Sequence, residues 1–431
     1  MDKKELIKEV LTRSTSYIIP SPEALEKELL SGKKLKIYLG ADPTGPHLHL
    51  GHLTNLLLLK RLQDLGHKVI FLVGDFTAMI GDPTDKLATR KPLTEKDVKE
   101  NMRTFKKQAS HIISFFSWMH PSSWGNGVKI RYNSEWYEKM TLKKFMKDLL
   151  GYFDVQNMLY REEYFTIQNM LQRDMFKERL KKWETSQHTE GLIGLKEFIY
   201  PILQGYDGVA MNVDIEVGGN DQMFNMAIGR ALRKAHVEKN TTPGEKFFVA
   251  TKLLINPKTG KKLMNKSEGG LINLDDSPEN IFGKVMALDD SSMFAVAEHC
   301  TFLPLTHIKD LQKMNPREAK LEIATAVVNT IYGKTAAEKA RENWINTFSK
   351  KEINATELPP LEIKSEEKIT VSDLVLLSKT ADSKSEARRL AKQGAVEING
   401  EAIKDVYEVL KLNSGDIIKI GKKNFFRIKI K

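Results

Sequence analysis

The hydrophobic positions in the first half of the chain follow two periods. Residues 36–42 and 67–75 are short apolar runs of strand length, and both close with glycine and aspartate. Between them, residues 54–66 carry leucines at helical spacing and stop at a glycine. Residues 128–136 and 211–219 are further strand candidates. Strand, helix and strand in this order predict an α/β fold with a doubly wound, Rossmann-like parallel sheet, whose ligands bind at the carboxyl ends of the strands.

Beyond this sheet the pattern becomes helical and then changes again. Ser277 and Pro278 open a helical stretch as its cap and first helical residue. The end of the chain combines two helix-like segments with short alternating strands. We therefore expect five parts, namely a catalytic domain over 1–245 with an inserted helical segment at about 138–200, a lysine-rich loop region over 246–276, a helical domain over 277–352, a polar, proline-bearing linker over 353–366 and a small α+β domain over 367–431.

Length and composition agree with this division and exclude several classes of protein. The chain has 431 residues, more than one core usually holds. Cys300 is its only cysteine, which excludes disulfide frameworks and multi-cysteine zinc sites. The net charge of +11 suggests an anionic partner without deciding which anion. No apolar run has the length of a bilayer, and residues 1–11 lack the apolar core of a secretory signal, so a cytoplasmic protein is expected.

Residues 38–52, "YLGADPTGPHLHLGH", combine a strand end, a tight turn and the start of a helix. The start of a helix offers free N–H groups and the positive end of its dipole to an anion. His49 and His52 are three residues apart, so both imidazoles lie on one face of the first turn and can donate to a phosphate. Gly51 leaves room beside the backbone for a base or a ribose. The segment therefore predicts a nucleotide-phosphate site.

Other phosphate and metal sites find little support. A zinc site of His47, His49 and His52 would lack a companion carboxylate at helical spacing, and the HExxH pattern is absent. The sequence also lacks a GxxxxGK[ST] loop and a GxGxxG turn, which argues against P-loop and dinucleotide-binding proteins. No dedicated metal site is expected.

Residues 259–270, "TGKKLMNKSEGG", are rich in lysine and glycine. Such a stretch is either an ordinary solvated loop or a basic loop that closes over phosphates. The phosphate site expected at residues 38–52 favours the second interpretation.

A second group of cations lies near the carboxyl terminus. Lys384, Arg388, Arg389 and Lys392 fall along one predicted helix and could contact RNA phosphates. The alternative is a solvated helix surface.

Several of these segments resemble a known family. "HLGH" at 49–52 resembles the HIGH signature of class I aminoacyl-tRNA synthetases, and the lysine loop resembles their KMSKS signature. Residues 38–52, 74–84, 200–207 and 217–222 look like the corresponding stretches of bacterial-type tyrosyl-tRNA synthetases, in the same order. The resemblance implies activation of L-tyrosine with ATP, accompanied by Mg²⁺, and transfer of the tyrosyl group to the 3′ end of tRNA(Tyr). It further implies a homodimer, an anticodon-binding helical domain over 277–352 and a terminal module of the ribosomal S-four RNA-binding type.

The resemblance also assigns roles to individual residues. Tyr38 and Asp207 would bind the phenolic hydroxyl of tyrosine. Asp82, Tyr200 and Gln204 would bind its α-ammonium group, and Gln222 would contact its carboxyl group. Tyr200, Gln204 and Asp207 are spaced i, i+4, i+7 and therefore share one helix face. The predicted ATP-binding residues are Gly40, Asp42, Thr44, His49, Gly51, His52, Gly219, Asp221 and Lys266. The predicted catalytic residues are Thr44, His49, His52, Lys86 and Arg90 in a flexible basic loop, and Lys262, Lys266 and Ser267 in the lysine loop.

Two positions depart from the family pattern. Glu216 stands where shorter members carry glutamine, which adds a charge near the tyrosine. In the lysine loop the first lysine position falls on Leu263, with Lys262 one residue earlier. Either the loop has one extra residue and Lys262 reaches into the site, or a contact has been lost. A tryptophanyl-tRNA synthetase and a synthetase-like RNA-binding protein with weakened catalysis remain as alternative functions.

Overall fold

The computed structural model divides the chain into two compact units, Met1–Ala340 and Arg341–Lys431. The residues that the structure describes are 2–82, 93–116, 126–153, 173–188, 194–237, 246–264, 270–348, 358–363, 369–378, 380–381, 383–392, 395–399, 401–403, 405, 409–410, 412–421 and 424–430.

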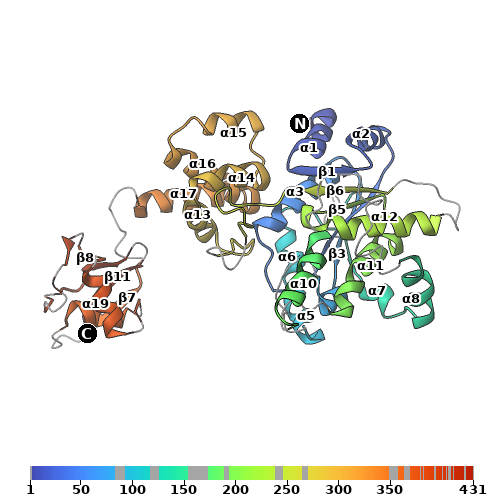
Figure 1. The fold of residues 1–431 in the computed structure, drawn as a ribbon. Helices are drawn as coiled ribbons and strands as arrows, with labels where there is room; N and C mark the ends of the chain where they lie inside the picture. Colours follow the sequence, from blue (N-terminus) through green and yellow to red (C-terminus); the bar gives the residue numbers. More distant parts are fainter. Residues whose placement is uncertain are drawn as a thin grey trace. The chain divides into compact units, whose positions relative to one another are not determined.

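The first unit is built on a six-stranded sheet with the order β1-β6-β5-β2-β3-β4 (Figure 1). Neighbouring strands are parallel except β1 and β6, which are antiparallel. In this spatial order the strands are β1 (Thr15–Ile19), β6 (Phe247–Thr251), β5 (Ile215–Gly219), β2 (Lys36–Ala41), β3 (Lys68–Val73) and β4 (Lys129–Tyr132). The fold is therefore α/β with a mostly parallel sheet, as the alternation of apolar runs predicted.

The strand predictions at 36–42 and 67–75 are confirmed by β2 and β3. The other two predicted strands, at 128–136 and 211–219, are longer than the strands in the structure. The run at 128–136 is a strand only over β4, and it continues into helix α7 (Ser134–Tyr137). The run at 211–219 is a strand only over β5, because Asn212 adopts a left-handed conformation with φ 49° and turns the chain before the strand begins. The pattern missed β1 and β6, which are only five residues long.

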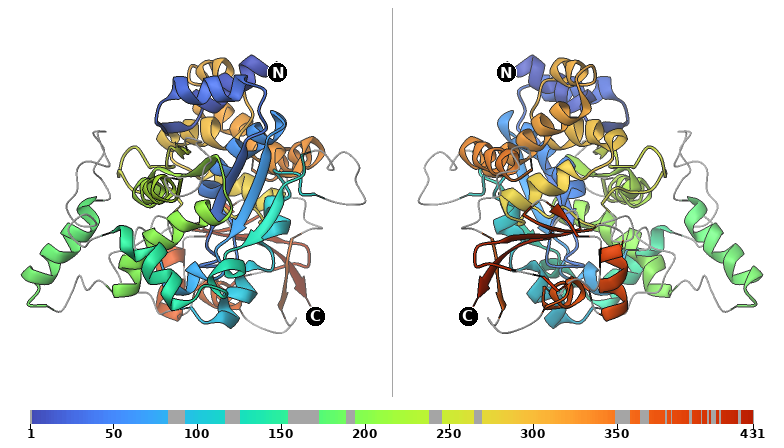
Figure 2. Two further views of the ribbon diagram at one scale, coloured as in Figure 1. Left: turned by 90° about the vertical axis from the view of Figure 1, so that its right-hand side faces the viewer. Right: turned by 90° about the vertical axis from the view of Figure 1, so that its left-hand side faces the viewer.

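The order of the strands reverses between β2 and β5. From β2 the chain winds through β3 to β4 on one side, and from β5 it winds to β6 on the other. Right-handed crossovers in opposite directions put their helices on opposite faces of a sheet. Helices α3 (Leu50–Asp64) and α12 (Met223–Val237) connect these strands, and Figure 2 shows helices on both sides of the sheet. Ligands bind at such a reversal, beyond the carboxyl ends of the strands.

Helix α3 begins at Leu50, within the segment where the sequence predicts a helix start, and it continues through the predicted helical run at 54–66 with His49 as its cap. The His49 side chain accepts a hydrogen bond from the Gly51 N–H, and the helix then buries a continuous row of leucines against the sheet. The helix ends before Gly66, which has φ 85° and so adopts the left-handed conformation that glycine tolerates best.

The remaining helices surround the sheet or follow it. The described parts of 138–200 and 277–348 contain helices and no strand, which agrees with the predicted helical character of both stretches. Helices α1 and α2 lie beside β1 (Figure 1). Their bounds and those of the others are α1 (Lys3–Thr12), α2 (Pro22–Leu30), α4 (Thr77–Ile80), α5 (Glu95–Met102), α6 (Phe105–Ala109), α8 (Leu142–Asp148), η3 (Leu150–Tyr152), α10 (Arg173–Thr185), α11 (Leu195–Ala210), η4 (Asn220–Gln222), α13 (Pro278–Met286), α14 (Asp290–Cys300), α15 (Leu305–Leu311), α16 (Pro316–Tyr332) and α17 (Lys334–Phe348).

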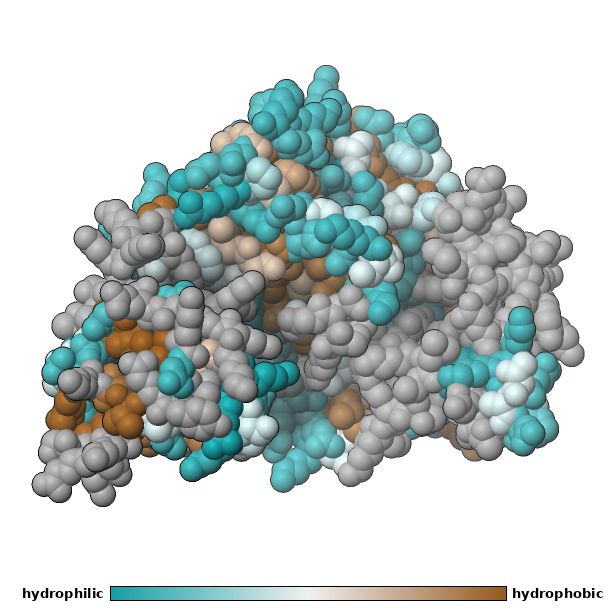
Figure 3. Space-filling view, turned by 60° about the vertical axis from the view of Figure 1, so that its left-hand side comes forward, coloured by the Kyte–Doolittle hydropathy of each residue, from teal (hydrophilic) through white to brown (hydrophobic). Residues whose placement is uncertain are grey.

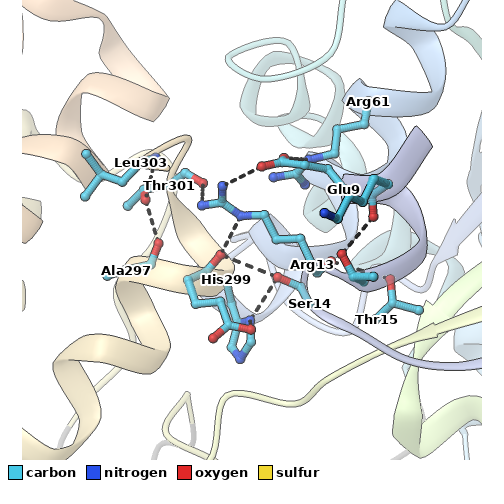
Figure 4. A network of polar contacts seen from close by, with 12 residues as sticks. Glu9, Arg13, Ser14, Thr15, Arg61, Ala297, His299, Thr301 and Leu303 are labelled. Carbon is cyan, nitrogen blue, oxygen red and sulfur yellow. Dashed lines mark hydrogen bonds and ion pairs between the residues drawn. The ribbon is translucent and has the colours of Figure 1, made fainter. Parts of the chain in front are cut away.

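A buried polar network ties α1 to α3 and to the end of α14 (Figure 4). Arg13 is 1% exposed and donates to the carboxylate of Glu9 at 3.1 Å and to the carbonyl of Thr301 at 2.7 Å. Arg61, on α3, donates to the other oxygen of Glu9 at 2.7 Å. These charged groups are buried only because each has a partner. The network therefore fixes the helix whose first turn carries His49 and His52.

The second unit contains a five-stranded sheet with the order β7-β11-β10-β8-β9. Strand β7 lies within the predicted linker, so the linker prediction was wrong at residues 360–363, where Leu361 and Ile363 are buried in the core of the unit. The other predicted helices and strands are present. Their bounds are β7 (Pro360–Ile363), α18 (Val371–Leu377), α19 (Lys384–Lys392), β8 (Val396–Ile398), β9 (Glu401–Ala402), β10 (Ile417–Ile420) and β11 (Asn424–Ile430).

On the face in Figure 3, hydrophilic residues predominate and hydrophobic residues show in patches between them. Within the described ranges, no helix has both the length and the hydropathy needed to span a bilayer.

Candidate active site

A cleft opens where β2 and β5 end. Every predicted tyrosine-, ATP- or phosphate-contacting residue that the structure describes lines this cleft. These residues are Tyr38, Gly40, Asp42, Thr44, His49, Gly51, His52, Asp82, Tyr200, Gln204, Asp207, Gly219, Asp221, Gln222 and Lys262. The predicted residues Lys86, Arg90, Lys266 and Ser267 lie outside the described ranges.

The two histidines of the cleft are held by the backbone of their own helix turn. The His49 N–H donates to Nδ1 of His52 at 3.1 Å, and the Gly51 N–H donates to Nδ1 of His49 at 3.1 Å. Desolvation lowers the pKa of His52 to about 4, so this imidazole is neutral at physiological pH. A neutral imidazole that accepts at Nδ1 carries its proton on Nε2. The hydrogen bonds thus leave Nε2–H as the donor on each ring, and the ring centroids are 4.1 Å apart.

Gly51 matters for a reason that the sequence did not suggest. A Cβ atom at this position would lie 3.0 Å from Cε1 and 3.1 Å from Nδ1 of the His49 ring. Glycine therefore lets the His49 ring fold back over the helix start and accept the Gly51 N–H. The next nearest atom is the Cβ of Met264, at 3.9 Å, which brings the lysine loop beside the same turn.

The lysine loop is anchored on both sides of its undescribed part. Before it, the Leu263 N–H donates to the Leu254 carbonyl at 2.7 Å. After it, the Leu50 N–H donates to the Ile272 carbonyl at 3.1 Å, and the Leu274 N–H donates to the Leu48 carbonyl at 2.8 Å. The chain that leaves the loop thus pairs directly with the segment that carries His49.

Lys262 belongs to the cleft and Leu263 does not. The Nζ atom of Lys262 lies 2.5 Å from Oδ2 of Asp221, and the lysine side chain remains 41% exposed. Leu263 is 8% exposed. Of the two alternatives for the lysine loop, this geometry supports the one in which Lys262 reaches into the site.

Gln108 holds the turn that connects β2 to α3. Its Nε2 donates to the Pro46 carbonyl at 2.8 Å, and its Oε1 accepts from the Leu48 N–H at 2.6 Å. Asn101 donates to the Pro43 carbonyl at 2.9 Å on the other side of the turn. The side-chain amides of Gln108 and Asn101 thus fix the backbone of the turn that contains Thr44 and His49.

Asp42 joins the phosphate end of the cleft to the tyrosine end. Its carboxylate accepts from Thr77 Oγ1 and from the Tyr200 hydroxyl, each at 2.8 Å. Desolvation raises the pKa of the Asp42 carboxyl to about 7, although these two hydrogen bonds lower it. A Cβ atom at Gly74 would lie 1.9 Å from Oδ1 of Asp42, so only glycine allows this carboxylate its position.

Asp207 lies at the buried base of the cleft and accepts two hydrogen bonds. Trp136 Nε1 donates to Oδ1 at 3.0 Å, and Asn133 Nδ2 donates to Oδ2 at 3.2 Å. Burial raises the pKa of the Asp207 carboxyl to about 8. Asn133 also donates to Thr77 Oγ1 at 2.9 Å and so links Asp207 to the partner of Asp42.

Tyr38 lies beside Asp207 with an unsatisfied hydroxyl. The residue is 2% exposed, and its hydroxyl has no hydrogen-bond partner among the described residues. Burial, together with the negative charges of Glu216 and Asp207, raises the pKa of the Tyr38 hydroxyl well above its ordinary value, so it is a donor at neutral pH. Leaving a buried polar group without a partner is costly, which makes this hydroxyl suited to a polar group of a ligand.

A chain of amides lines the wall opposite the histidines. Gln222 Nε2 donates to Oδ2 of Asp82 at 2.8 Å. Asn225 Nδ2 donates to Oε1 of Gln222 at 2.9 Å and to Oε1 of Gln204 at 2.8 Å. The prediction that Tyr200, Gln204 and Asp207 share one helix face is confirmed, because all three lie on α11 and line the cleft.

His47 lies away from these groups. Its Nδ1 is 2.8 Å from Oδ2 of Asp275, and the side chain is 47% exposed. In the part of the chain that the structure describes, no three histidine, cysteine or acidic side chains gather as a metal site would require.

The predicted RNA-contacting cations lie on α19. Lys384, Arg388 and Arg389 are exposed, while Ala387 and Ala391 of the same helix are buried in the core of the second unit. Lys384 lies 3.8 Å from Asp373 and Arg389 lies 3.6 Å from Glu386. The side chain of Lys392 falls outside the described part.

Four polar residues of the site were not predicted from the sequence: Thr77, Gln108, Asn133 and Trp136. Asn133 lies inside the strand candidate at 128–136, so its position at the end of β4, where site residues gather, is evident only from the structure. Gln108 lies within a helix of ordinary composition, so only the folded structure brings its amide to the turn.

Two family models together match almost the whole chain. The model described as "tRNA synthetases class I (W and Y)" matches residues 30–349. The model described as "Tyrosine--tRNA ligase SYY-like C-terminal domain" matches residues 351–428.

Individual relatives agree with these models. The tyrosine--tRNA ligase of Thermotoga maritima is 35% identical over 99% of this chain and 98% of its own length. The tyrosine--tRNA ligase of Carboxydothermus hydrogenoformans is 36% identical over 97% of both chains. Among solved structures, a C-terminally truncated mitochondrial tyrosyl-tRNA synthetase of Aspergillus nidulans has a TM-score of 0.61 at 23% identity and covers 80% of this chain and 99% of that chain, which supports the fold.

Proposed function

Because this chain belongs to the tyrosine--tRNA ligases among the class I tRNA synthetases, we propose how its cleft carries out the two steps of that activity. In the first step, a carboxylate oxygen of L-tyrosine attacks the α-phosphorus of ATP, and the bond to pyrophosphate breaks. In the second, a terminal ribose hydroxyl of tRNA(Tyr) attacks the tyrosyl carbonyl, and AMP leaves.

The phosphate end of the cleft would stabilise the charge that develops in the first step. In-line displacement at phosphorus depends on positioning and on charge stabilisation more than on covalent catalysis. The Nε2–H groups of His49 and His52 are neutral donors held in place by the helix start. Lys262 adds a cation from the lysine loop. Thr44 would donate to the same phosphates, and Gly40, Asp42 and Asp221 would hold the ribose and base.

The other end of the cleft would bind tyrosine. Its α-ammonium group would be held by Asp82, Tyr200 and Gln204, and its carboxyl group by Gln222. Its phenolic hydroxyl would bridge the hydroxyl of Tyr38 and the carboxyl of Asp207. Phenylalanine would leave the Tyr38 hydroxyl without a partner and would make no hydrogen bond to Asp207, a principle for which enzymes of this family are themselves the standard example.

The observation that carries this proposal is the buried hydroxyl of Tyr38 next to Asp207. Two buried groups that need a hydroxyl between them fit a phenol and disfavour the indole of tryptophan, which offers only an N–H donor. The intact set of donors around His49 and His52 argues against the second alternative, an RNA-binding protein with weakened catalysis.

The undescribed residues keep their predicted roles within the proposal. Lys86 and Arg90 would contact the pyrophosphate as it leaves, and Lys266 and Ser267 would complete the lysine loop. Mg²⁺ would arrive with the phosphates of ATP and neutralise part of their charge, since no protein metal site is needed for it.

Catalysis and RNA binding would be carried out by different domains of the chain. The domain over 1–245, with its insert at about 138–200, would perform the chemistry together with the loop region over 246–276. The helical domain over 277–352 would bind the anticodon, and the module over 367–431 would bind RNA through Lys384, Arg388, Arg389 and Lys392. We further propose a homodimer that acts in the cytoplasm, where tRNA and ATP are available and where the buried Cys300 stays reduced.

The proposal is tested by charging tRNA(Tyr) transcript with labelled amino acids in the presence of ATP and Mg²⁺. Tyrosine should be transferred, and tryptophan and phenylalanine should not. Charging with tryptophan, or tRNA binding without charging by any amino acid, would contradict it.

A further inference from the structure

Glu216 and Lys246 form a buried ion pair at the cleft, which Glu216 itself lines. Glu216 lies on β5 and Lys246 immediately precedes β6, and Oε2 and Nζ are 2.7 Å apart. The residues are 1% and 2% exposed, respectively. The sheet register sets Glu216 opposite Tyr38 on β2. Buried ion pairs are costly to desolvate and contribute little net stability, so stability alone does not account for this one.

The space for the ion pair is provided by two glycines. A Cβ atom at Gly208, on α11, would lie 2.2 Å from Nζ of Lys246. A Cβ atom at Gly229, on α12, would lie 2.9 Å from the same Nζ and 3.2 Å from Oε2 of Glu216. Both helices therefore leave room for this lysine. The charge that Glu216 adds relative to the family's glutamine is balanced within the fold.

The ion pair is connected to the amides that line the cleft. The second carboxylate oxygen of Glu216, Oε1, accepts a long hydrogen bond of 3.5 Å from Nε2 of Gln204. Oε1 of Gln204 then accepts from Asn225 at 2.8 Å, and Asn225 also donates to Gln222 at 2.9 Å. The chain of contacts thus runs from Lys246 to the predicted ligands of the amino and carboxyl groups of tyrosine.

A carboxylate fixes the direction of the Gln204 amide. An ionised carboxylate can only accept, so Gln204 must turn its Nε2 toward Glu216 and its Oε1 away from it. A glutamine at position 216 could donate or accept, so the hydrogen bond from Asn225 alone would then hold the Gln204 amide against a flip. An α-ammonium group is only a donor, so a flipped amide would meet it with the wrong group.

We propose that Glu216 and Lys246 are positioning residues that hold Gln204 with its acceptor toward the α-ammonium group of the bound amino acid. Glu216 orients the amide, and Lys246 balances the charge of Glu216 behind a cleft that already contains several carboxyl groups. This inference rests on the proposed binding of tyrosine in the same cleft.

The test compares tyrosine with 3-(4-hydroxyphenyl)propionate, which has the same phenol and carboxyl groups but no ammonium group. The double variant Glu216→Gln/Lys246→Met removes both charges together, so neither is left buried alone. We expect the KM for tyrosine in ATP–pyrophosphate exchange to rise about tenfold, the effect of weakening one hydrogen bond to a charged group. The KM for ATP and the inhibition constant of the propionate should stay within about twofold of wild type.

Two further variants separate orientation from stability. Gly208→Ala keeps both charges and displaces the Lys246 ammonium group, which is the nearest atom to the added Cβ. This variant should therefore weaken the binding of tyrosine and not that of the propionate. If the double variant fails to fold, Gly208→Ala alone tests the positioning role. Glu9→Gln, which weakens a buried network that contains no cleft-lining residue, is the control. It should lower the melting temperature and leave the tyrosine KM and the inhibition constant of the propionate unchanged.

If the binding of tyrosine and of the propionate were weakened equally, the inference would be overturned, because this result would indicate a general distortion of the pocket. Unchanged tyrosine KM in both cleft variants would overturn it as well. In either case wild-type exchange with tyrosine remains, so the proposed function would stand. Absence of tyrosine-dependent exchange in the wild type would instead remove the proposed function and the inference with it.

Discussion

The Nζ atom of Lys262 lies 2.5 Å from the Oδ2 atom of Asp221. This contact joins the lysine loop to the residue that follows β5, at the point where the strand order of the sheet reverses. Lys262 and Met264 line the cleft, whereas the intervening Leu263 is buried. We infer that the loop has one extra residue relative to its signature and that Lys262, not position 263, acts as its first lysine.

Substitution of Lys262 should therefore affect the rate of the reaction, and substitution of Leu263 should affect the stability of the protein. Lys262→Ala should lower the rate of adenylate formation by about ten- to a hundredfold, because a cation near the phosphates is lost, and should leave the melting temperature unchanged. Leu263→Ala should cost about 2–3 kcal/mol of stability through the cavity it leaves, with a nearly normal rate. Single-turnover kinetics and thermal unfolding measure the two effects. A normal rate in Lys262→Ala would show that the contact has been lost from catalysis.

Removal of His52 should slow adenylate formation without weakening tyrosine binding. His52→Ala deletes the Nε2–H donor and also leaves the His49 N–H without its acceptor. We expect a loss of about a hundredfold in rate. Because the pKa of His52 lies near 4, the histidine is neutral from pH 5.5 to 8 and the loss should be the same across this range. His47→Ala is the matched control, since His47 pairs with Asp275 outside the cleft. A large rise in tyrosine KM for His52→Ala would argue against this role.

The sequence was sufficient for the part of the site that depends on local order. Tyr200, Gln204 and Asp207 share a face because helical spacing brings i, i+4 and i+7 together, and α11 has that geometry. The strand ends at Asp42 and Gly219 gather because parallel strands end at the same edge of a sheet. The first conclusion needs only helix geometry, and the second needs only the parallel pairing of β2 with β5.

Discrimination against phenylalanine should depend on Asp207. Asp207→Ala removes one of the two buried partners of the phenolic hydroxyl and leaves Trp136 Nε1 without its acceptor. The ratio of kcat/KM for tyrosine over phenylalanine should fall by about ten- to a hundredfold, as expected when a buried hydroxyl loses its hydrogen-bond partner. Exchange assays with both amino acids measure it. An unchanged ratio would refute the assigned contact.

The stability of the first unit should fall as the pH rises toward 8. The pKa of the Asp207 carboxyl is about 8 in the folded protein, against an ordinary value of 3.8, so folding favours its protonated form. This contribution to stability is complete below pH ~4 and is lost as the pH rises through ~8, at up to about 1.4 kcal/mol per pH unit. Asp207→Asn does not titrate, so its melting temperature should gain on wild type between pH 5 and 8. A difference in melting temperature that stays constant over this pH range would contradict this assignment.

The remaining features depend on contacts that sequence patterns do not report. Asn133 lies between Thr77 and Asp207 only because β4 ends beside β3, and Gln108 reaches Pro46 only because α6 packs against the turn after β2. Lys246 reads as an ordinary surface lysine in the sequence, whereas the fold buries it against Glu216. In each case a side chain acquires its partner from an element far away in the chain.

Amino-acid-dependent exchange of pyrophosphate into ATP, measured with each of the twenty amino acids, tests the central claim most directly. We predict rapid exchange with tyrosine, none with tryptophan, and at most a trace with phenylalanine. Exchange with tryptophan but not tyrosine, or with no amino acid, would contradict the claim that this cleft activates tyrosine.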